Sequence, residues 1–191
     1  EGGQPEIMRP CLALFCQLST IAYAHSSSNA CVFNGAELRD RSGSLVGCAA
    51  LANRSVALYF AGEWCPLCRR FTPALREFHA RYRDSMSIVF VSSDDSPEDA
   101  NHHYAASHGD WLQLAWGDAI AASLKRQHRV WSGREVGEFG HNRRSGVPCV
   151  VVIDRDGKEV AFLAGERYGA AALHEWEPEQ AVRWPVEKAE L

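Results

Sequence analysis

The chain has 191 residues, of which 46% are hydrophobic, 10% aromatic and 23% charged. This length and composition are typical of one soluble globular domain with a sizeable core, and they exclude a disordered or fibrous protein. The formal net charge of −4 gives no broad positive field, so we expect neither nucleic acid nor an anionic lipid surface as the main partner. The number of cysteines, seven, is odd, so at least one stays free or pairs with another molecule.

Residues 1–34 are predicted to be an N-terminal extension outside the folded domain. Residues 1–7 show no hydrophobic pattern and are interpreted as a tag remnant or upstream sequence. Residues 8–24 have the pattern of a secretory signal peptide. The basic residue Arg9 is followed by an apolar stretch, then by Ala22-Tyr23-Ala24 and a polar segment. The apolar stretch is shorter than the roughly 20 residues that cross a bilayer, so we expect no membrane span.

Two other interpretations of residues 8–24 stay open. A buried helix is one, because polar residues interrupt the apolar run. An organellar transit peptide is the other, because no acidic residue occurs between Met8 and Ala36, although Arg9 is the one strong base there. We expect the protein to be cytoplasmic, with the secretory lumen or the mitochondrion as alternatives if residues 8–24 are a targeting segment.

Residues 35–180 are predicted to form one domain in which buried strands alternate with helices. Short apolar runs indicate the strands, and apolar residues at helical spacing beside capping residues indicate the helices. Parallel units followed by a terminal hairpin predict an α/β fold with a central mixed β-sheet flanked by helices. In chain order we expect a strand at 56–61, a helix at 66–83, a strand at 88–91, a helix from 97 to about 107, a strand at 112–114, a helix capped by Asp118 that runs to 128, and strands at 149–153 and 160–163 joined by an Asp156-Gly157 turn.

Two segments of the chain carry no regular pattern. Residues 130–145 are rich in Gly, Arg and Glu and show no period, so we interpret them as a loop insertion within the domain. Residues 181–191 are interpreted as a C-terminal tail.

The segment Trp64-Cys65-Pro66-Leu67-Cys68 lies where the first predicted strand ends and the first helix begins. A Cys-x-x-Cys is weak evidence alone, because chance pairs at this spacing are common among seven cysteines. Pro66, however, suits the first turn of a helix, and a helix N-terminus offers free amides and partial positive charge to the Cys65 sulfur. A thiolate is favoured there, so we interpret Cys65 as the nucleophile and Cys68, one turn on, as the resolving thiol.

Two structural interpretations compete with this chemistry. Half of a zinc site is the first, but there is no second Cys-x-x-Cys, and the adjacent His102-His103 lacks the usual ligand separation. An inert structural disulfide is the second, although it would need neither the strand-to-helix position nor the proline. We therefore expect no metal.

A second element supports a redox site. Gly146-Val147-Pro148-Cys149 comes directly before a predicted strand, far downstream of the cysteine pair. A cis bond before this proline leaves backbone groups free to pair with an incoming chain, whereas a trans-proline that opens a strand is the alternative.

These residues resemble the thioredoxin superfamily, and more narrowly the tryparedoxin and nucleoredoxin group. The resemblance covers roughly residues 35–165. By this resemblance Cys65 attacks, Cys68 resolves, Trp64 shields the pair, and Val147 and Pro148 form the cis-proline element that binds substrate beside Pro66. It is carried by Ala57-Leu58-Tyr59-Phe60, Trp64-Cys65-Pro66-Leu67-Cys68-Arg69, Phe71-Thr72-Pro73, the segment from Ile88 to Asp94, Gly146-Val147-Pro148 and the segment from Val150 to Gly157.

Tyr59 suits the tryparedoxin group better than ordinary thioredoxins, and three other features depart from the pattern that the resemblance leads us to expect. Tyr59 stands where ordinary thioredoxins place a buried aspartate, so the proton of Cys68 needs another route, such as water. Leu67 stands where tryparedoxins usually have a second proline. The insertion at 130–145 comes just before the docking proline and could cover or reshape the binding face. Cys149 replaces a commoner threonine, and we expect it to be a buried residue, with a third reactive thiol as the alternative.

Four acidic residues follow the second strand. Asp94, Asp95, Glu98 and Asp99 are expected to form the solvated start of a helix. Attraction of a cationic donor such as the polyamine-linked dithiol trypanothione is the alternative role.

The function implied is that of a thiol–disulfide oxidoreductase that reduces protein or small-molecule disulfides without a bound cofactor. Electrons would come from a dithiol such as trypanothione, from glutathione or from a reductase. Disulfide-containing proteins such as peroxidases would be the partners of a monomer. Two alternatives remain: a luminal oxidase or isomerase with structural pairing among Cys31, Cys48 and others, and a non-catalytic binding module with a redox switch. No role is assigned to Cys11 or Cys16.

Overall fold

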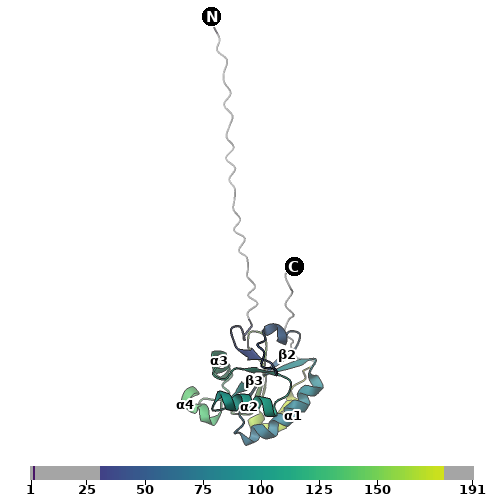
Figure 1. The fold of residues 1–191 in the computed structure, drawn as a ribbon, viewed down its shortest axis with the longest axis vertical. Helices are drawn as coiled ribbons and strands as arrows, with labels where there is room; N and C mark the ends of the chain where they lie inside the picture. Colours follow the sequence, from purple (N-terminus) through teal and green to yellow (C-terminus); the bar gives the residue numbers. More distant parts are fainter. Residues whose placement is uncertain (1, 3–30, 179–191) are drawn as a thin grey trace.

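The computed structural model describes residue 2 and residues 31–178 (Figure 1). The predictions for residues 8–24, for Cys11 and Cys16 and for the tail at 181–191 therefore lie outside the described residues. No helix in the described part of the chain is long and apolar enough to cross a membrane.

A six-stranded mixed sheet forms the centre of the fold, with strand order β1-β4-β3-β2-β5-β6. The pairs β2–β3 and β3–β4 are parallel, and the pairs β1–β4, β2–β5 and β5–β6 are antiparallel. Every residue of β2, β3 and β5 is buried, which explains why these strands appear as continuous apolar runs. The strands are β1 (Leu38–Arg39), β2 (Ser55–Ala61), β3 (Met86–Ser92), β4 (Leu112–Leu114), β5 (Cys149–Ile153) and β6 (Glu159–Leu163).

Helices surround this sheet, as Figure 1 shows, and the expected α/β class with a mixed sheet flanked by helices is confirmed. The two longer helices after α1 begin at side-chain caps, because Ser96 accepts a bond from the Asp99 amide and Asp118 from the Ile120 amide. The α-helices are α1 (Pro66–Tyr82), α2 (Pro97–Ser107), α3 (Ala119–His128), α4 (Val136–Phe139) and α5 (Gly165–Tyr168), and the 3₁₀ helices are η1 (Cys48–Leu51), η2 (Gly133–Glu135) and η3 (Gly169–Glu175).

The loop interpretation of residues 130–145 is wrong in part, because η2 and α4 lie within this segment. A capping box joins Ser132 and Glu135 at the start of η2. Glu135 also forms an ion pair with the buried Lys125 of α3, which attaches the insertion to the body of the domain. Helices of three and four residues are too short to leave a period in the sequence, which is why the pattern indicated a loop.

A disulfide between Cys31 and Cys48 joins the start of the described segment 31–178 to η1, with the two Cα atoms 6.4 Å apart. Cys31 and Phe33 are buried in the same core as the central strands, although both precede residue 35. The amide of Val32 also donates to the carbonyl of Arg155, so this segment is held at two places on the domain.

Candidate active site

The cysteine pair lies at the N-terminus of α1, directly after the central strand β2. Cys65 is the N-cap of α1, Pro66 occupies the first helical turn, and the Cys65 sulfur accepts a hydrogen bond of 3.2 Å from the Cys68 amide. Both cysteines are free thiols in this structure, and both are buried. The Cys65 sulfur therefore replaces the oxygen that usually caps a helix, as the proline and the strand-to-helix position predict.

The two thiols of the pair have opposite pKa shifts. The hydrogen bond from the Cys68 thiol, together with the amides of Cys68 and Leu67, lowers the pKa of Cys65 to about 6, against the opposing effects of burial and of Glu166. Burial raises the pKa of Cys68, and its hydrogen bond to Cys65 adds to the rise. At neutral pH the sulfur of Cys65 is therefore a thiolate and Cys68 is the thiol that donates to it.

The proline loop approaches this thiolate from a distant part of the sequence. The peptide bond between Val147 and Pro148 is cis, and the carbonyl oxygen of Val147 lies 3.5 Å from the Cys65 sulfur. The preceding amide, that of Gly146, donates to the carboxylate of Glu166 at 2.5 Å, and Arg143 of the insertion also binds this carboxylate. The structure thus brings Val147 and Pro148 together with the cysteine pair, and Glu166 supports the loop that carries them.

Trp64 is half-buried beside the pair and is held from two sides. Its indole N–H donates to the carbonyl of Ser93 at 2.9 Å, and the guanidinium of Arg134 lies 4.1 Å from the centroid of its ring system. Arg134 belongs to the insertion and forms an ion pair with Asp95. A Cβ atom at Gly62 would lie 2.7 Å from the indole nitrogen, so glycine is required for this position of the tryptophan. The insertion reaches the face that contains Cys65.

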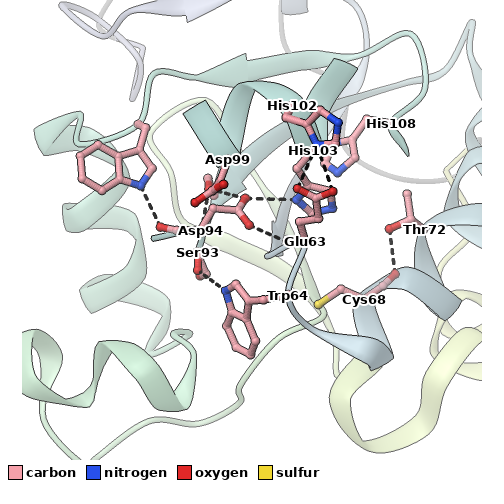
Figure 2. A network of polar contacts seen from close by, with 12 residues as sticks. Glu63, Trp64, Cys68, Thr72, Ser93, Asp94, Asp99, His102, His103 and His108 are labelled. Carbon is pink, nitrogen blue, oxygen red and sulfur yellow. Dashed lines mark hydrogen bonds and ion pairs between the residues drawn. The ribbon is translucent and has the colours of Figure 1, made fainter. Parts of the chain in front are cut away.

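Asp94 lies behind this face, and the expectation that it is solvated is wrong. Its side chain is 1% exposed and accepts hydrogen bonds from the Glu63 amide, the Ser92 hydroxyl and Nδ1 of His103 (Figure 2). Burial raises the pKa of Asp94, but these three donors outweigh it and hold the pKa below its ordinary value. A buried carboxylate was not visible in the sequence, because its partners lie at distant positions or in a pair of histidines considered only as metal ligands.

The other three acidic residues of this group are exposed, as expected for the start of a helix. Asp99 accepts a hydrogen bond from the N-cap hydroxyl of Ser96, and Asp95 pairs with Arg134. The group therefore contains one buried carboxylate and three at the surface.

Tyr59, which replaces the aspartate of ordinary thioredoxins, is fully buried beneath the pair. Its hydroxyl lies 2.8 Å from the hydroxyl of Thr72, which in turn donates to the carbonyl of Cys68. Burial is the main cause that raises the pKa of Tyr59, and the neighbouring Cys68 and Cys65 add to the rise. The phenol therefore stays neutral and offers no carboxylate-like proton acceptor beside Cys68.

The remaining features of the sequence-based site are a leucine and a third thiol. Leu67 is 40% exposed at the start of α1, between the two cysteines of the pair in the sequence. Cys149 is fully buried in β5, and burial raises its pKa. Within residues 31–178, no group of three or more His, Cys, Asp or Glu side chains is placed to hold a metal ion.

The cysteine pair and the proline loop lie within a region that matches a known protein family. The family model described as thioredoxin-like matches residues 53–159, which is more than half of the chain. The chain belongs to the thioredoxin-like family. The matched residues of this thioredoxin-like chain run from just before β2 to the start of β6 and include the cysteine pair, Asp94 and Pro148.

Several curated proteins resemble this thioredoxin-like chain over part of their length. Tryparedoxin from Trypanosoma brucei brucei is 35% identical over 80 residues, which are 41% of this chain and 54% of that protein. Nucleoredoxin-like protein 1 from Homo sapiens is 29% identical over 139 residues, 66% of this chain and 58% of that protein. Probable nucleoredoxin 1 from Arabidopsis thaliana is 33% identical over 93 residues, 47% of this chain and 16% of that protein. The chain thus spans between 16% and 58% of these three relatives.

Solved structures show the same fold. Thioredoxin from Wuchereria bancrofti is 36% identical with a TM-score of 0.57, and the match covers 75% of this chain and 88% of that one. Tryparedoxin II in complex with glutathionylspermidine is 22% identical with a TM-score of 0.58, covering 78% of this chain and 91% of that one. The expected thioredoxin-like fold is confirmed by both likenesses.

Proposed function

We propose that this chain is a thiol–disulfide oxidoreductase that reduces protein or small-molecule disulfides through Cys65 and Cys68. One observation carries the proposal: the Cys65 sulfur caps α1 and has a lowered pKa, while the thiol of Cys68, whose pKa is raised, donates a hydrogen bond to it. A thiolate is the nucleophile in disulfide exchange, and a protonated neighbour one turn away is a second thiol held in reserve.

The proposed reaction has two exchange steps. The Cys65 thiolate attacks one sulfur of the substrate disulfide, so that this S–S bond breaks, a mixed disulfide forms at Cys65 and the other substrate sulfur leaves as a thiolate that takes up a proton. Cys68 then loses its proton and attacks the Cys65 sulfur, which releases the second substrate thiol and forms the Cys65–Cys68 disulfide. Two electrons pass from the pair to the substrate. A dithiol or reductase returns them by the reverse exchange.

The proline loop is the proposed docking element for the substrate chain. The carbonyl of Val147, in the peptide bond to Pro148, lies beside the Cys65 sulfur. Trp64 and Pro66 are the residues directly before and after Cys65 in the sequence. An extended substrate segment can pair with backbone groups of this loop, which would align its disulfide with the attacking sulfur.

The electron donor and the partners are proposed from the kinship with tryparedoxin. A tryparedoxin II structure contains glutathionylspermidine, which supports trypanothione or glutathione as the donor, with a reductase as the other source. Disulfide-containing proteins such as peroxidases are the proposed targets, and the chain is proposed to act as a monomer without a bound cofactor.

The Cys31–Cys48 disulfide favours a second candidate, a disulfide oxidase or isomerase in an oxidising compartment. Structural disulfides persist mainly in secreted and luminal proteins and are rare in the cytosol. This observation supports the secretory lumen over the cytoplasm as the site of action, and it agrees with the signal-like composition of residues 8–24. Sequencing the mature N-terminus from cells would show whether residues 8–24 are removed.

The test is reduction of insulin disulfides by the full chain and by the Cys65→Ser and Cys68→Ser variants, with dithiothreitol, trypanothione and glutathione as separate donors. Wild-type turnover should exceed the Cys65→Ser background, and Cys68→Ser should trap a mixed disulfide at Cys65. Wild-type activity no higher than that background would contradict the proposed enzyme and favour a non-catalytic binding module with a redox switch. A trapped adduct at Cys149 would overturn the assigned roles.

A further inference from the structure

Glu63, two residues before Cys65, is held by all three of its hydrogen-bonding groups. Its amide donates to Asp94 at 2.6 Å, its carbonyl accepts from Arg69 of α1 at 3.1 Å, and its carboxylate binds Nδ1 of His102 at 3.0 Å. Three separate elements therefore fix the loop between β2 and α1. The side chain of His102 is 69% exposed, so the contacts through the backbone of Glu63 are the more firmly placed.

His103, the next residue of α2, holds the carboxylate that holds Glu63. Its Nδ1 lies 3.1 Å from Oδ2 of Asp94, and the two side chains are each 1% exposed. Since an ionised carboxylate only accepts hydrogen bonds, Nδ1 of His103 carries the proton. The ring of His103 packs against Phe90 and His108, so its orientation is determined by the core.

The loop of Asp94 is itself fixed through its backbone. Three successive carbonyls accept bonds from side chains of other elements: that of Ser92 from Lys125, that of Ser93 from Trp64 and that of Asp94 from Trp116. Asp94 cannot therefore move away from the cysteine pair without breaking contacts to three parts of the molecule.

The charge of Asp94 acts on Cys68. With three donors Asp94 is ionised even though it is buried, and its negative charge adds to burial and to the hydrogen bond with Cys65, which are the larger causes that raise the pKa of Cys68. It is not among the causes that shift Cys65, whose sulfur lies at the helix N-terminus. A like charge near one of two coupled thiols places the proton on that thiol and leaves the thiolate on the other.

We infer that Asp94, held by His103, is a positioning residue for the cysteine pair: it fixes Glu63 at the base of the active-site loop, and its buried charge adds to burial in favouring the proton on Cys68 over Cys65. This role rests on the proposed disulfide exchange. Where this chain has Tyr59 in β2, the resemblance to thioredoxins leads one to expect a buried aspartate. In this chain the buried carboxylate is Asp94, just after β3. It acts through its charge and by holding the loop, and it does not take up the proton of Cys68.

Asp94 contacts His103 of α2, and its charge acts on Cys68 of α1. Asp94 also lines a cavity of about 290 Å³, together with the titratable side chains of Asp118, Lys125, Arg134, Glu135 and Glu138. Lys125 binds Glu135 and Arg134 binds Asp95, so the charges of these neighbours are paired with each other.

The test is a pH titration of the reduced full chain, followed by the ¹³C shifts of the Cys65 and Cys68 Cβ atoms, for wild type and Asp94→Asn. Asparagine keeps an acceptor for the Glu63 amide and removes the charge. The Cys68 midpoint should fall and the Cys65 midpoint should stay near its wild-type value, so that the gap between them narrows by up to about one unit. Glu98→Gln, which removes an exposed negative charge from the first turn of α2, should leave the gap as in wild type.

A variant of His103 keeps the inference testable if Asp94→Asn does not fold. His103→Leu removes one hydrogen-bond donor from Asp94 and should narrow the difference between the Cys68 and Cys65 midpoints by a smaller amount. His103→Asn restores a donor near the place of Nδ1 and should return this difference toward the wild-type value. An unchanged gap in folded Asp94→Asn, or in both His103 variants, overturns the inference. Insulin reduction measured on the same samples separates the two proposals. If the wild-type protein shows no turnover, but the difference between the two cysteine midpoints still narrows in Asp94→Asn, then only the proposed function is contradicted.

Discussion

Two cysteine pairs lie in one small domain, and their surroundings differ. Cys31 and Cys48 are 17 residues apart, lie outside the long helices and form a disulfide that closes a loop. Cys65 and Cys68 are one helical turn apart at a helix N-terminus and form no disulfide. The pKa of Cys65 is lowered and that of Cys68 is raised, so the proton between them stays on Cys68. The same side chain is therefore a structural link in one place and the proposed nucleophile in the other. The difference comes from backbone amides, burial and neighbouring charge, because the residue type is the same.

Removing one sulfur from each pair should separate the two roles most strongly. Cys65→Ser should lower insulin reduction by about a thousandfold or more, to the background rate, because a serine hydroxyl at neutral pH is not a nucleophile for disulfides. Cys31→Ser should keep turnover within about twofold of wild type, measured at a temperature where both variants are folded. Equal losses in the two variants would contradict the division of roles.

The pH dependence of alkylation should distinguish the two kinds of thiol next. Because the pKa of Cys65 is lowered to about 6, its thiolate is present above that pH, and its rate of reaction with iodoacetamide should fall tenfold per unit below it. Free cysteine added as the reference thiol should show the same fall below about pH 8.5, the ordinary thiol value. Mass spectrometry follows both rates in one sample, and coincident midpoints would show that the helix N-terminus does not activate Cys65.

Loss of the structural link should lower stability instead of activity. The Cys31→Ser/Cys48→Ser variant frees a loop with a sequence separation of 17 and should lose about 3 kcal/mol of unfolding free energy. Urea denaturation of the oxidised wild type and of the double variant measures this difference, and reduced wild type is the matched control. A loss below about 0.5 kcal/mol would mean that the remaining contacts of residues 31–34 hold this segment without the disulfide.

The smallest expected effect concerns the insertion. Arg134→Ala removes the cation–π contact with Trp64 and the ion pair with Asp95, and we expect it to change KM for a protein disulfide by about two- to fivefold at unchanged stability. Arg126→Ala is the matched control, because Arg126 makes the same kind of contact with Phe139 of α4 and pairs with Glu138. Identical kinetics for both variants would place the insertion outside the substrate path.

Local features of the site could be predicted from the sequence because local physics determines them. The strand before Cys65, the proline at the helix start and the proline loop before β5 each have a signal within a few residues. The sheet and most helix bounds followed from hydrophobic period and capping residues in the same way.

The features that could not be predicted depend on distant partners. Asp94 is polar and follows a strand, so exposure was expected, and only the approach of Glu63 and His103 makes its burial favourable. The partner of Cys31 could not be deduced, because cysteine spacing does not determine connectivity. The short helices of the insertion leave no period for a pattern to detect.

The helix cap made by the Cys65 sulfur has a consequence for the direction of electron flow. Every interaction that favours the Cys65 thiolate stabilises the dithiol state, and the disulfide state does not receive the same benefit because it carries no charge at that sulfur. The lower the pKa of this thiol, the more readily the oxidised pair accepts electrons. In the proposed function, the activation of Cys65 and the oxidising power of a Cys65–Cys68 disulfide would thus be set by the same donors at the start of α1, the Cys68 thiol first and then the amides of Cys68 and Leu67.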